Sequence, residues 1–220
     1  MRKTGWFDRL IKLAIGGLMF WSLAALAEDN WKLVKDEDGI KVYTQPVEGS
    51  NFLEFKGVAD LDASLPQCAG LVMSIPHMPK WMYGTTHAEQ VSAVSDVDRV
   101  IYMVQHAPFP LKDRDLYVHN TLTQNADNSV VYAMDLMPEK AIDSKYVHVK
   151  KLHTRVTMIA LSANKTHVEY RAHVDPGGKV PSWAANLVVT DTPFNTLKQA
   201  QEIIKTTKDS LTLSSVKNPY

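Results

Sequence analysis

Apolar and polar residues alternate over most of the chain between residues 31 and 174. The first two alternating runs, 31–35 and 40–43, flank Asp38-Gly39, a dipeptide typical of two-residue hairpin turns because glycine readily adopts a positive φ. Later alternating or β-branched runs predict further strands over residues 52–59, 100–106, 115–123, 130–137, 152–161 and 168–174. Because these strands follow one another through short connections, we expect an antiparallel sheet.

The spacing of apolar residues becomes helical in two parts of the chain. The first part predicts a short helix, whose apolar positions are Leu65, Cys68, Ala69, Val72 and Met73. A second helix or turn that contains Trp81 follows it. The second part predicts a long helix from Pro181 to about Lys205, with an apolar stripe made by Trp183, Leu187, Phe194, Leu197 and Ile204. Pro193 inside this run predicts a bend. From Asp209 onward the polar sequence predicts a tail that frays.

This order of elements predicts a single α+β domain in which a curved antiparallel sheet wraps around one long C-terminal helix. One helix cannot fill the concave face of so many strands, so an internal hollow is expected. A dry, empty cavity of ~300–1,000 Å³ would cost ~7–24 kcal/mol. Whole domains have a stability of only ~5–15 kcal/mol. We therefore expect the hollow to be filled by a ligand, hydrated or partly collapsed.

The first 27 residues have the pattern of a secretory signal peptide. An uncharged apolar stretch over residues 13–26 follows basic residues and ends in the small-x-small site Ala25-Leu26-Ala27. We therefore expect a signal peptide over 1–27, a folded domain over 28–208 and a polar tail over 209–220, in a periplasmic or secreted protein. An uncleaved N-terminal anchor is the alternative. Cleavage would leave 20 basic and 23 acidic residues, a balance that argues against a nucleic-acid partner.

The sequence contains no cluster typical of catalysis or metal binding. Its eight histidines form no His-x-x-x-His or Glu-x-x-His pair, and neither a Gly-x-Ser-x-Gly elbow nor a glycine-rich phosphate loop occurs. Cys68 is the only cysteine, so no internal disulfide can form, and its apolar helical setting predicts a buried, unreactive thiol. We therefore expect no cofactor, no metal site and no catalytic residue.

Four segments of the chain resemble the START (steroidogenic acute regulatory protein-related lipid transfer) family in its exported bacterial form. They are Trp31 with 38–43, the segment 108–115 with its Arg114-Asp115 pair, Met137-Pro138-Glu139, and the segment 174–186, in which two glycines precede Pro181-Ser182-Trp183. The resemblance implies a helix-grip fold, a tunnel for one lipid, and no cofactor. It also implies a gate formed by the loop over 106–112 and the C-terminal helix. Sterol-carrying members of the family have an arginine at the position of Asn120, so a sterol is the less expected ligand.

Strand alternation indicates which side chains face the hollow. On the strand over 115–123, Leu116, Val118 and Asn120 share one face, whereas Tyr117 and His119 share the other. Extended to the other elements, this reasoning gives the candidate ligand-binding residues Trp81, Met103, Leu116, Val118, Asn120, Met134, Val156, Met158, Tyr170, Trp183, Leu187 and Phe194. An ordinary packed core is an equal alternative for each position, because interior apolar residues serve both purposes.

The function expected from these observations is binding of a lipid or another hydrophobic molecule, with transport or buffering of it, by a monomer that contacts membranes transiently. Two alternatives use the same cavity. The first is an enzyme of cyclase type, which would need an acid–base pair inside the cavity. The second is a binding module that senses its ligand and signals to a partner protein through an exposed apolar patch.

Overall fold

The structure is a computed structural model that describes residues 30–138 and 145–220, except for the side chains of Leu187, Val188 and Lys208. The predicted signal peptide over 1–27 lies outside the described residues, as does Glu139 of the Met-Pro-Glu motif. No helix in the described part of the chain is long and apolar enough to cross a membrane.

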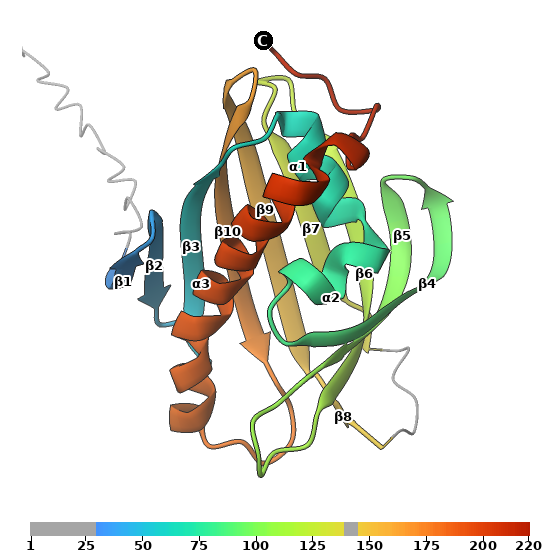
Figure 1. Cartoon of the computed structure of the whole chain (residues 1–220). Coiled ribbons are helices and arrows are strands. Elements are labelled where there is room, and N and C mark those ends of the chain that lie inside the picture. The colour runs from blue at the N-terminus through green and yellow to red at the C-terminus, as the bar shows by residue number, and fades with distance from the viewer. Residues whose placement is uncertain (1–29, 139–144) are drawn as a thin grey trace, which may run out of the picture.

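The strands form one strongly curved sheet (Figure 1), which has ten strands within the described residues. In chain order they are β1 (Lys32–Glu37), β2 (Ile40–Gln45), β3 (Glu54–Leu61), β4 (Thr85–Ser95), β5 (Asp98–Gln105), β6 (Arg114–Gln124), β7 (Val130–Leu136), β8 (Val147–His148), β9 (Lys151–Ser162) and β10 (Lys165–Asp175). Their order in space is β1-β2-β3-β10-β9-β7-β6-β5-β4, and β8 lies parallel to the start of β6. The neighbouring pairs along the main path are antiparallel, which confirms the predicted sheet.

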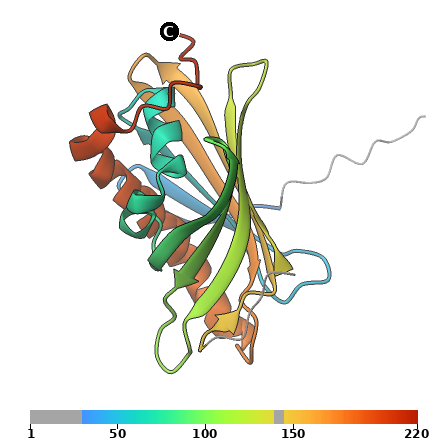
Figure 2. The ribbon, with the colours of Figure 1, turned by 90° about the vertical axis from the view of Figure 1, so that its right-hand side faces the viewer.

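The helices lie inside the curve of the sheet (Figure 2). Three short ones, α1 (Leu65–Met73), η1 (Ile75–His77) and α2 (Met78–Trp81), connect β3 to β4. The long α3 (Ser182–Thr207) follows β10 and leads into η3 (Lys208–Ser210). The predicted hairpin turn is also present, since Asp38 and Gly39 both have positive φ, 53° and 73°. The α+β helix-grip arrangement expected from the sequence is therefore confirmed.

The long helix α3 approaches the sheet most closely at Gly57, in the middle of β3. A Cβ atom at this position would lie 2.9 Å from both Pro193 Cβ and Leu197 Cδ1, which is too close for any real contact. The helix continues through Pro193, whose ring is part of this contact. Only glycine at position 57 therefore allows α3 to rest directly on the sheet.

The segment after α3 is not the fraying polar tail that its composition predicts. Leu211 and Val216 are 6% and 5% exposed and belong to the core. The backbone N–H of Leu213 donates to the Pro66 carbonyl of α1 at 3.0 Å. Gln124 exchanges two hydrogen bonds with the backbone of Lys217, at 2.8 and 2.9 Å. Widely spaced apolar residues in a polar sequence thus suffice to tie this segment to α1 and the β6–β7 hairpin.

The contact between Gly57 and α3 can be tested by filling the gap. We expect Gly57→Ala to destabilise the domain by about 1–3 kcal/mol, because the added methyl overpacks the helix contact. Adding Leu197→Val should recover part of this loss, since valine lacks the Cδ1 atom that lies 2.9 Å from the position of the new methyl. Urea unfolding of the single and double variants measures both effects. Strict additivity of the two changes would show that Gly57 and Leu197 are not coupled.

Candidate functional site

The inner face of the sheet is apolar, as strand alternation predicts. On β6, Leu116, Val118 and Leu122 are at most 6% exposed, whereas Tyr117 and His119, between them, are only partly buried. The same alternation holds on β9, with Val156 and Met158 inside, and on β10, with Val168 and Tyr170 inside. The face that the helices cover is therefore a continuous apolar surface across the middle of the sheet.

Ten of the twelve candidate ligand-binding residues lie inside the domain. Each is at most 6% exposed: Trp81, Met103, Leu116, Val118, Asn120, Met134, Val156, Met158, Tyr170 and Phe194. Leu187 lies on α3, but its side chain lies outside the part that the structure describes. The burial of the ten residues is equally compatible with core packing, so their contact with a ligand stays a prediction.

Trp183 does not pack into the interior with the rest of the predicted apolar stripe, and its contact with a ligand stays a prediction. Its side chain is 70% exposed at the first turn of α3. Helical spacing placed it on the apolar stripe, but the first turn of the helix does not pack into the core in the way that Phe194 and Leu197 do. A periodic pattern cannot show where along a helix its contact with the sheet begins.

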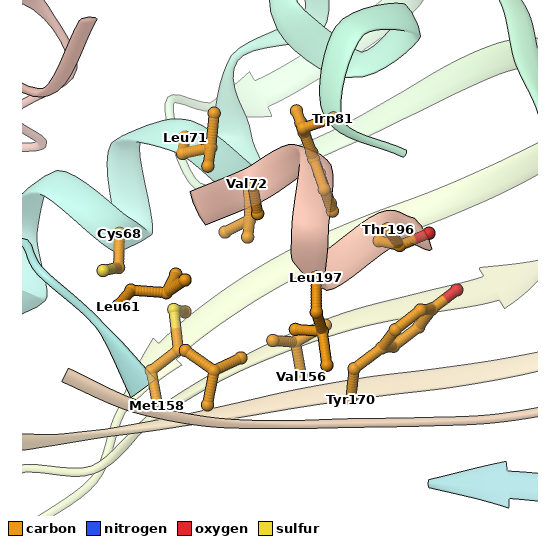
Figure 3. Close-up of a pocket in the computed structure, with 12 residues that line it drawn as sticks. Leu61, Cys68, Leu71, Val72, Trp81, Val156, Met158, Tyr170, Thr196 and Leu197 are labelled. Atoms are coloured by element: carbon orange, nitrogen blue, oxygen red, sulfur yellow. The ribbon is translucent and has the colours of Figure 1, made fainter. Parts of the chain in front are cut away.

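Among the described residues, the cavity between the helices and the sheet is small and apolar, not an open hollow. Its volume is about 20 Å³, and it lies between the helices and the sheet, lined by Leu61, Cys68, Leu71, Val72, Trp81, Val156, Met158, Val168, Tyr170, Thr196, Leu197 and Ala200 (Figure 3). One water molecule needs ~10–15 Å³, whereas sites for small ligands usually span ~300–1,000 Å³. Buried long side chains, among them Met103, Met134 and Tyr132, occupy the interior instead. Partial collapse is thus the state of the hollow in this structure.

A buried polar pair interrupts the apolar inner face. Asn120 Nδ2 donates a 2.6 Å hydrogen bond to Tyr132 Oη, and both side chains are at most 1% exposed. Asn120 Oδ1 accepts no hydrogen bond from the described residues. Burial raises the pKa of Tyr132 and of Tyr170, so both phenols stay neutral. This pair offers an interior hydrogen-bond acceptor to a polar group of a ligand.

A guanidinium group lies close to this pair. Arg99 on β5 is the direct cross-strand neighbour of Asn120 on β6, and its positive charge opposes the effect of burial on the pKa of Tyr132. Its Nη2 donates to the carbonyl of Asp96, and its buried Nε has no acceptor in the described part of the chain. Sequence reasoning missed Arg99, because the predicted strand begins at residue 100 and the β5–β6 register is not visible in a local pattern.

Hydrogen bonds to one carboxylate hold the loop over 106–112. Asp113 Oδ1 accepts from the Ala107 backbone N–H and contacts His106 Nδ1, both at 3.0 Å. The Ala107 N–H, helped by His106, keeps the pKa of Asp113 below its usual value. Phe109, at the loop's tip, is 97% exposed. The loop therefore has a fixed base and an exposed aromatic tip.

Known proteins resemble this chain in sequence and in fold. The START domain model matches residues 19–209. This chain belongs to the START domain family. An uncharacterised protein from Pseudomonas aeruginosa is 34% identical over 175 residues, which are 79% of this chain and 86% of that protein. The predicted family is thereby confirmed.

Two further relatives of this START domain are lipid transfer proteins. Rat phosphatidylcholine transfer protein is 25% identical over 169 residues, covering 74% of this chain and 78% of that protein. The crystal structure of a STAR-related lipid transfer protein from Xanthomonas axonopodis, a fragment of residues 25–204, is 31% identical with a TM-score of 0.75. The match covers 80% of this chain and 99% of that one. Binding of lipids or other hydrophobic ligands is the function these relatives support for the START domain.

The interior hydrogen bond can be tested by a double-mutant cycle. We expect Asn120→Leu to cost about 1–3 kcal/mol of folding free energy, because it leaves the Tyr132 hydroxyl buried without its partner. The double variant with Tyr132→Phe should cost less than the sum of the single changes. Urea unfolding gives these free energies, with Tyr117→Phe on the outer face as a control expected within about 0.5 kcal/mol. If the two changes are additive, the hydrogen bond does not contribute to the free energy of folding.

Proposed function

We propose that this START domain binds one amphiphilic lipid between α3 and the inner face of the sheet, and that it carries or buffers this lipid. The observation that carries the proposal is the buried acceptor Asn120 Oδ1 within a largely apolar face. The apolar face would bury the hydrocarbon part of the ligand, which contributes about 0.8 kcal/mol per CH₂ group. A polar group of the ligand would donate to Asn120.

Binding requires the interior to expand, because a cavity of about 20 Å³ cannot hold a lipid. Methionine side chains are suited to this change, since their three rotatable bonds allow them to move aside and repack. Met103, Met134 and Met158 are each at most 3% exposed and lie on three different strands of the inner face. We therefore propose that the ligand displaces these side chains while the strands remain in place.

The attachment of α3 favours opening at its N-terminal end. Phe194, Leu197, Ala200 and Ile204 bury the C-terminal part of the helix at 5% exposure or less. The N-terminal part is held by polar contacts of Asn186, whose Oδ1 accepts from the Leu53 N–H at 3.1 Å. None of the described side chains over 182–192 is fully buried, so among them lifting this end costs less burial than lifting the other end. The loop over 106–112 is the second movable element in the proposed gate.

The same end of the molecule offers a surface for transient membrane contact. The loop over 106–112 and the start of α3 both lie at its lower end in Figure 1 and in Figure 2. Each presents one exposed aromatic side chain, Phe109 at 97% and Trp183 at 70%. Tryptophan favours the interface between lipid and water. The two exposed aromatic side chains, together with the signal pattern over 1–27, support action at a membrane outside the cytoplasm.

Binding without a chemical step fits the interior better than catalysis does. An enzyme would need an acid–base pair facing the ligand. The inner-face polar groups named above are an amide, a guanidinium and two phenols, and burial raises the pKa of both phenols away from the range of a useful base. The described residues hold no group of three or more potential metal ligands. We therefore propose that the domain is a carrier.

A bound lipid should accompany the protein from its natural source. Native mass spectrometry should show one added lipid mass per chain, and a monomer. Extraction with organic solvent should lower the melting temperature, because binding stabilises only the folded state. Re-addition of the lipid should restore it. The absence of any co-purifying lipid, together with an unchanged melting temperature after extraction, would count against the carrier function.

The gate can be tested at Asn186. We expect Asn186→Ala to speed transfer of pyrene-labelled phosphatidylcholine between vesicles by about fivefold, because opening no longer breaks its hydrogen bond to the Leu53 N–H, which stabilises by about 1 kcal/mol. The melting temperature should change little, since the buried half of α3 is intact. Asn164→Ala, in the β9–β10 turn, is the matched control and should leave transfer unchanged. Equal transfer rates in all three proteins would place the entrance elsewhere.

A further inference from the structure

Arg114 is a buried cation for which the described structure provides no ion pair. It is the first residue of β6 and is 7% exposed. Its Nη1 donates to the Lys112 carbonyl, and its Nε has no hydrogen-bond acceptor among the described residues. Burial lowers the pKa of its guanidinium, and the charge of Asp113 only partly opposes this. One backbone carbonyl is a small share of the five donors that a guanidinium presents.

The carboxylates beside Arg114 in sequence have other partners. Asp113 Oδ1 is occupied by the Ala107 N–H and by His106. Asp115 lies on the opposite face of the strand, where it contacts His148 Nδ1 at 2.5 Å and accepts a 3.3 Å hydrogen bond from Tyr102. Lys112, on the other side, is exposed and adds positive charge at the rim. Burying a charge without a partner is costly, so a site that retains one is suited to an anion.

Arg114 lies at the end of the inner face where β6 follows the loop over 106–112 of the proposed gate. By alternation it shares the inner face with Leu116 and Val118, and it pairs across the sheet with Gln105. Arg99, opposite Asn120, lies six residues away from Gln105 along β5, or about 20 Å at ~3.3 Å per residue. The apolar residues Ile101, Met103, Leu116 and Val118 lie between the two ends, and all are buried.

We propose that Arg114 is an anion-binding residue of the lipid site, which receives the phosphate or carboxylate oxygens of an amphiphile whose chain lies along the inner face toward Val118. This rests on the proposed function. A guanidinium fits such oxygens with two parallel N–H donors, which gives both affinity and orientation. Arg114 would thus select anionic over neutral amphiphiles at the entrance. The Asn120 pair, at the far end, would receive a second polar group of the ligand.

The test compares two amphiphiles with the same chain and different heads, hexadecyl phosphate and hexadecanol, by titration calorimetry on the full mature chain. Wild-type protein should bind the phosphate at least tenfold more tightly than the alcohol, because hydrogen bonds between charged groups exceed neutral ones. Arg114→Met should bring the two affinities within about twofold without weakening the alcohol. Arg114→Lys should keep part of the preference, since it retains the charge but not the paired donors.

Two arginine variants serve as controls. Arg171→Met removes an equal charge from the outer face, where Arg171 pairs with Glu54 at 3.2 Å, and should leave the preference intact. If Arg99→Met abolishes the preference and Arg114→Met does not, the anion lies at the Asn120 end and the proposal is wrong. Should Arg114→Met not fold, the graded response of Arg114→Lys still decides, because an unchanged preference there would overturn the paired-donor site.

Further outcomes separate the source of the anion from the proposed function. Inorganic phosphate alone should not raise the melting temperature; if it does so in wild type and not in Arg114→Met, the site takes a free anion and the lipid assignment is overturned. Equal affinity of wild type for both amphiphiles would refute the Arg114 site and leave the carrier function standing. Binding of neither would overturn the carrier function and this inference with it.

Glu139 and Asp143 lie outside the described residues, so Glu139→Gln and Asp143→Asn are included. If either one changes folding stability non-additively with Arg114→Met, the charge already has a protein partner and the proposal fails.

Discussion

The contact between α3 and the concave face of the sheet is the interaction on which the rest of the structure depends. Ten strands curve around one helix, and the helix can bury its apolar stripe only by lying directly on β3. Gly57 permits that approach, and the side chains of Pro193 and Leu197 occupy the space that any larger residue would need. Because the helix rests on β3, at one side of the sheet, the inner face of β5–β7 is left for other side chains, and in the proposed function for a ligand, to cover.

The two halves of α3 contribute differently to stability, and this difference connects the fold with its proposed function. Burial of Phe194 and Ile204 fixes the C-terminal half, and the segment around Leu211 and Val216 ties the following chain to α1. Hydrogen bonds of Asn186 hold the N-terminal half, where Trp183 remains exposed. A helix whose described side chains are buried at one end and partly exposed at the other would open an entrance without unfolding the core, since local openings follow the least stable contacts.

Local sequence patterns predicted the features that depend on neighbouring residues, and they missed the features that depend on contacts between residues distant in sequence. The Asp38-Gly39 turn, the inner face of β6 and the extent of α3 all follow from the nearest few residues, and they were predicted correctly. The position of Arg99 opposite Asn120 depends on a strand register that no local pattern contains. The burial of Val216 and the exposure of Trp183 depend on where a neighbouring element ends. The small cavity depends on how all interior side chains pack together, which is the least local property of the chain.

The collapse of the interior resolves a difficulty that a ligand-binding fold must meet. A rigid empty cavity large enough for a lipid would consume most of the stability of a domain of this size. Side chains such as Met103 and Met134 fill that volume instead, so the unloaded protein retains a packed core. In the proposed function, the ligand would replace one set of apolar contacts with another, and the hydrophobic gain on loading would be smaller than the full burial of its chain. Polar groups on this face, Asn120 among them, cannot be satisfied by such repacking because the replaced side chains are apolar. Discrimination between ligands therefore falls to these few polar groups, while the apolar face determines only that the ligand is hydrophobic.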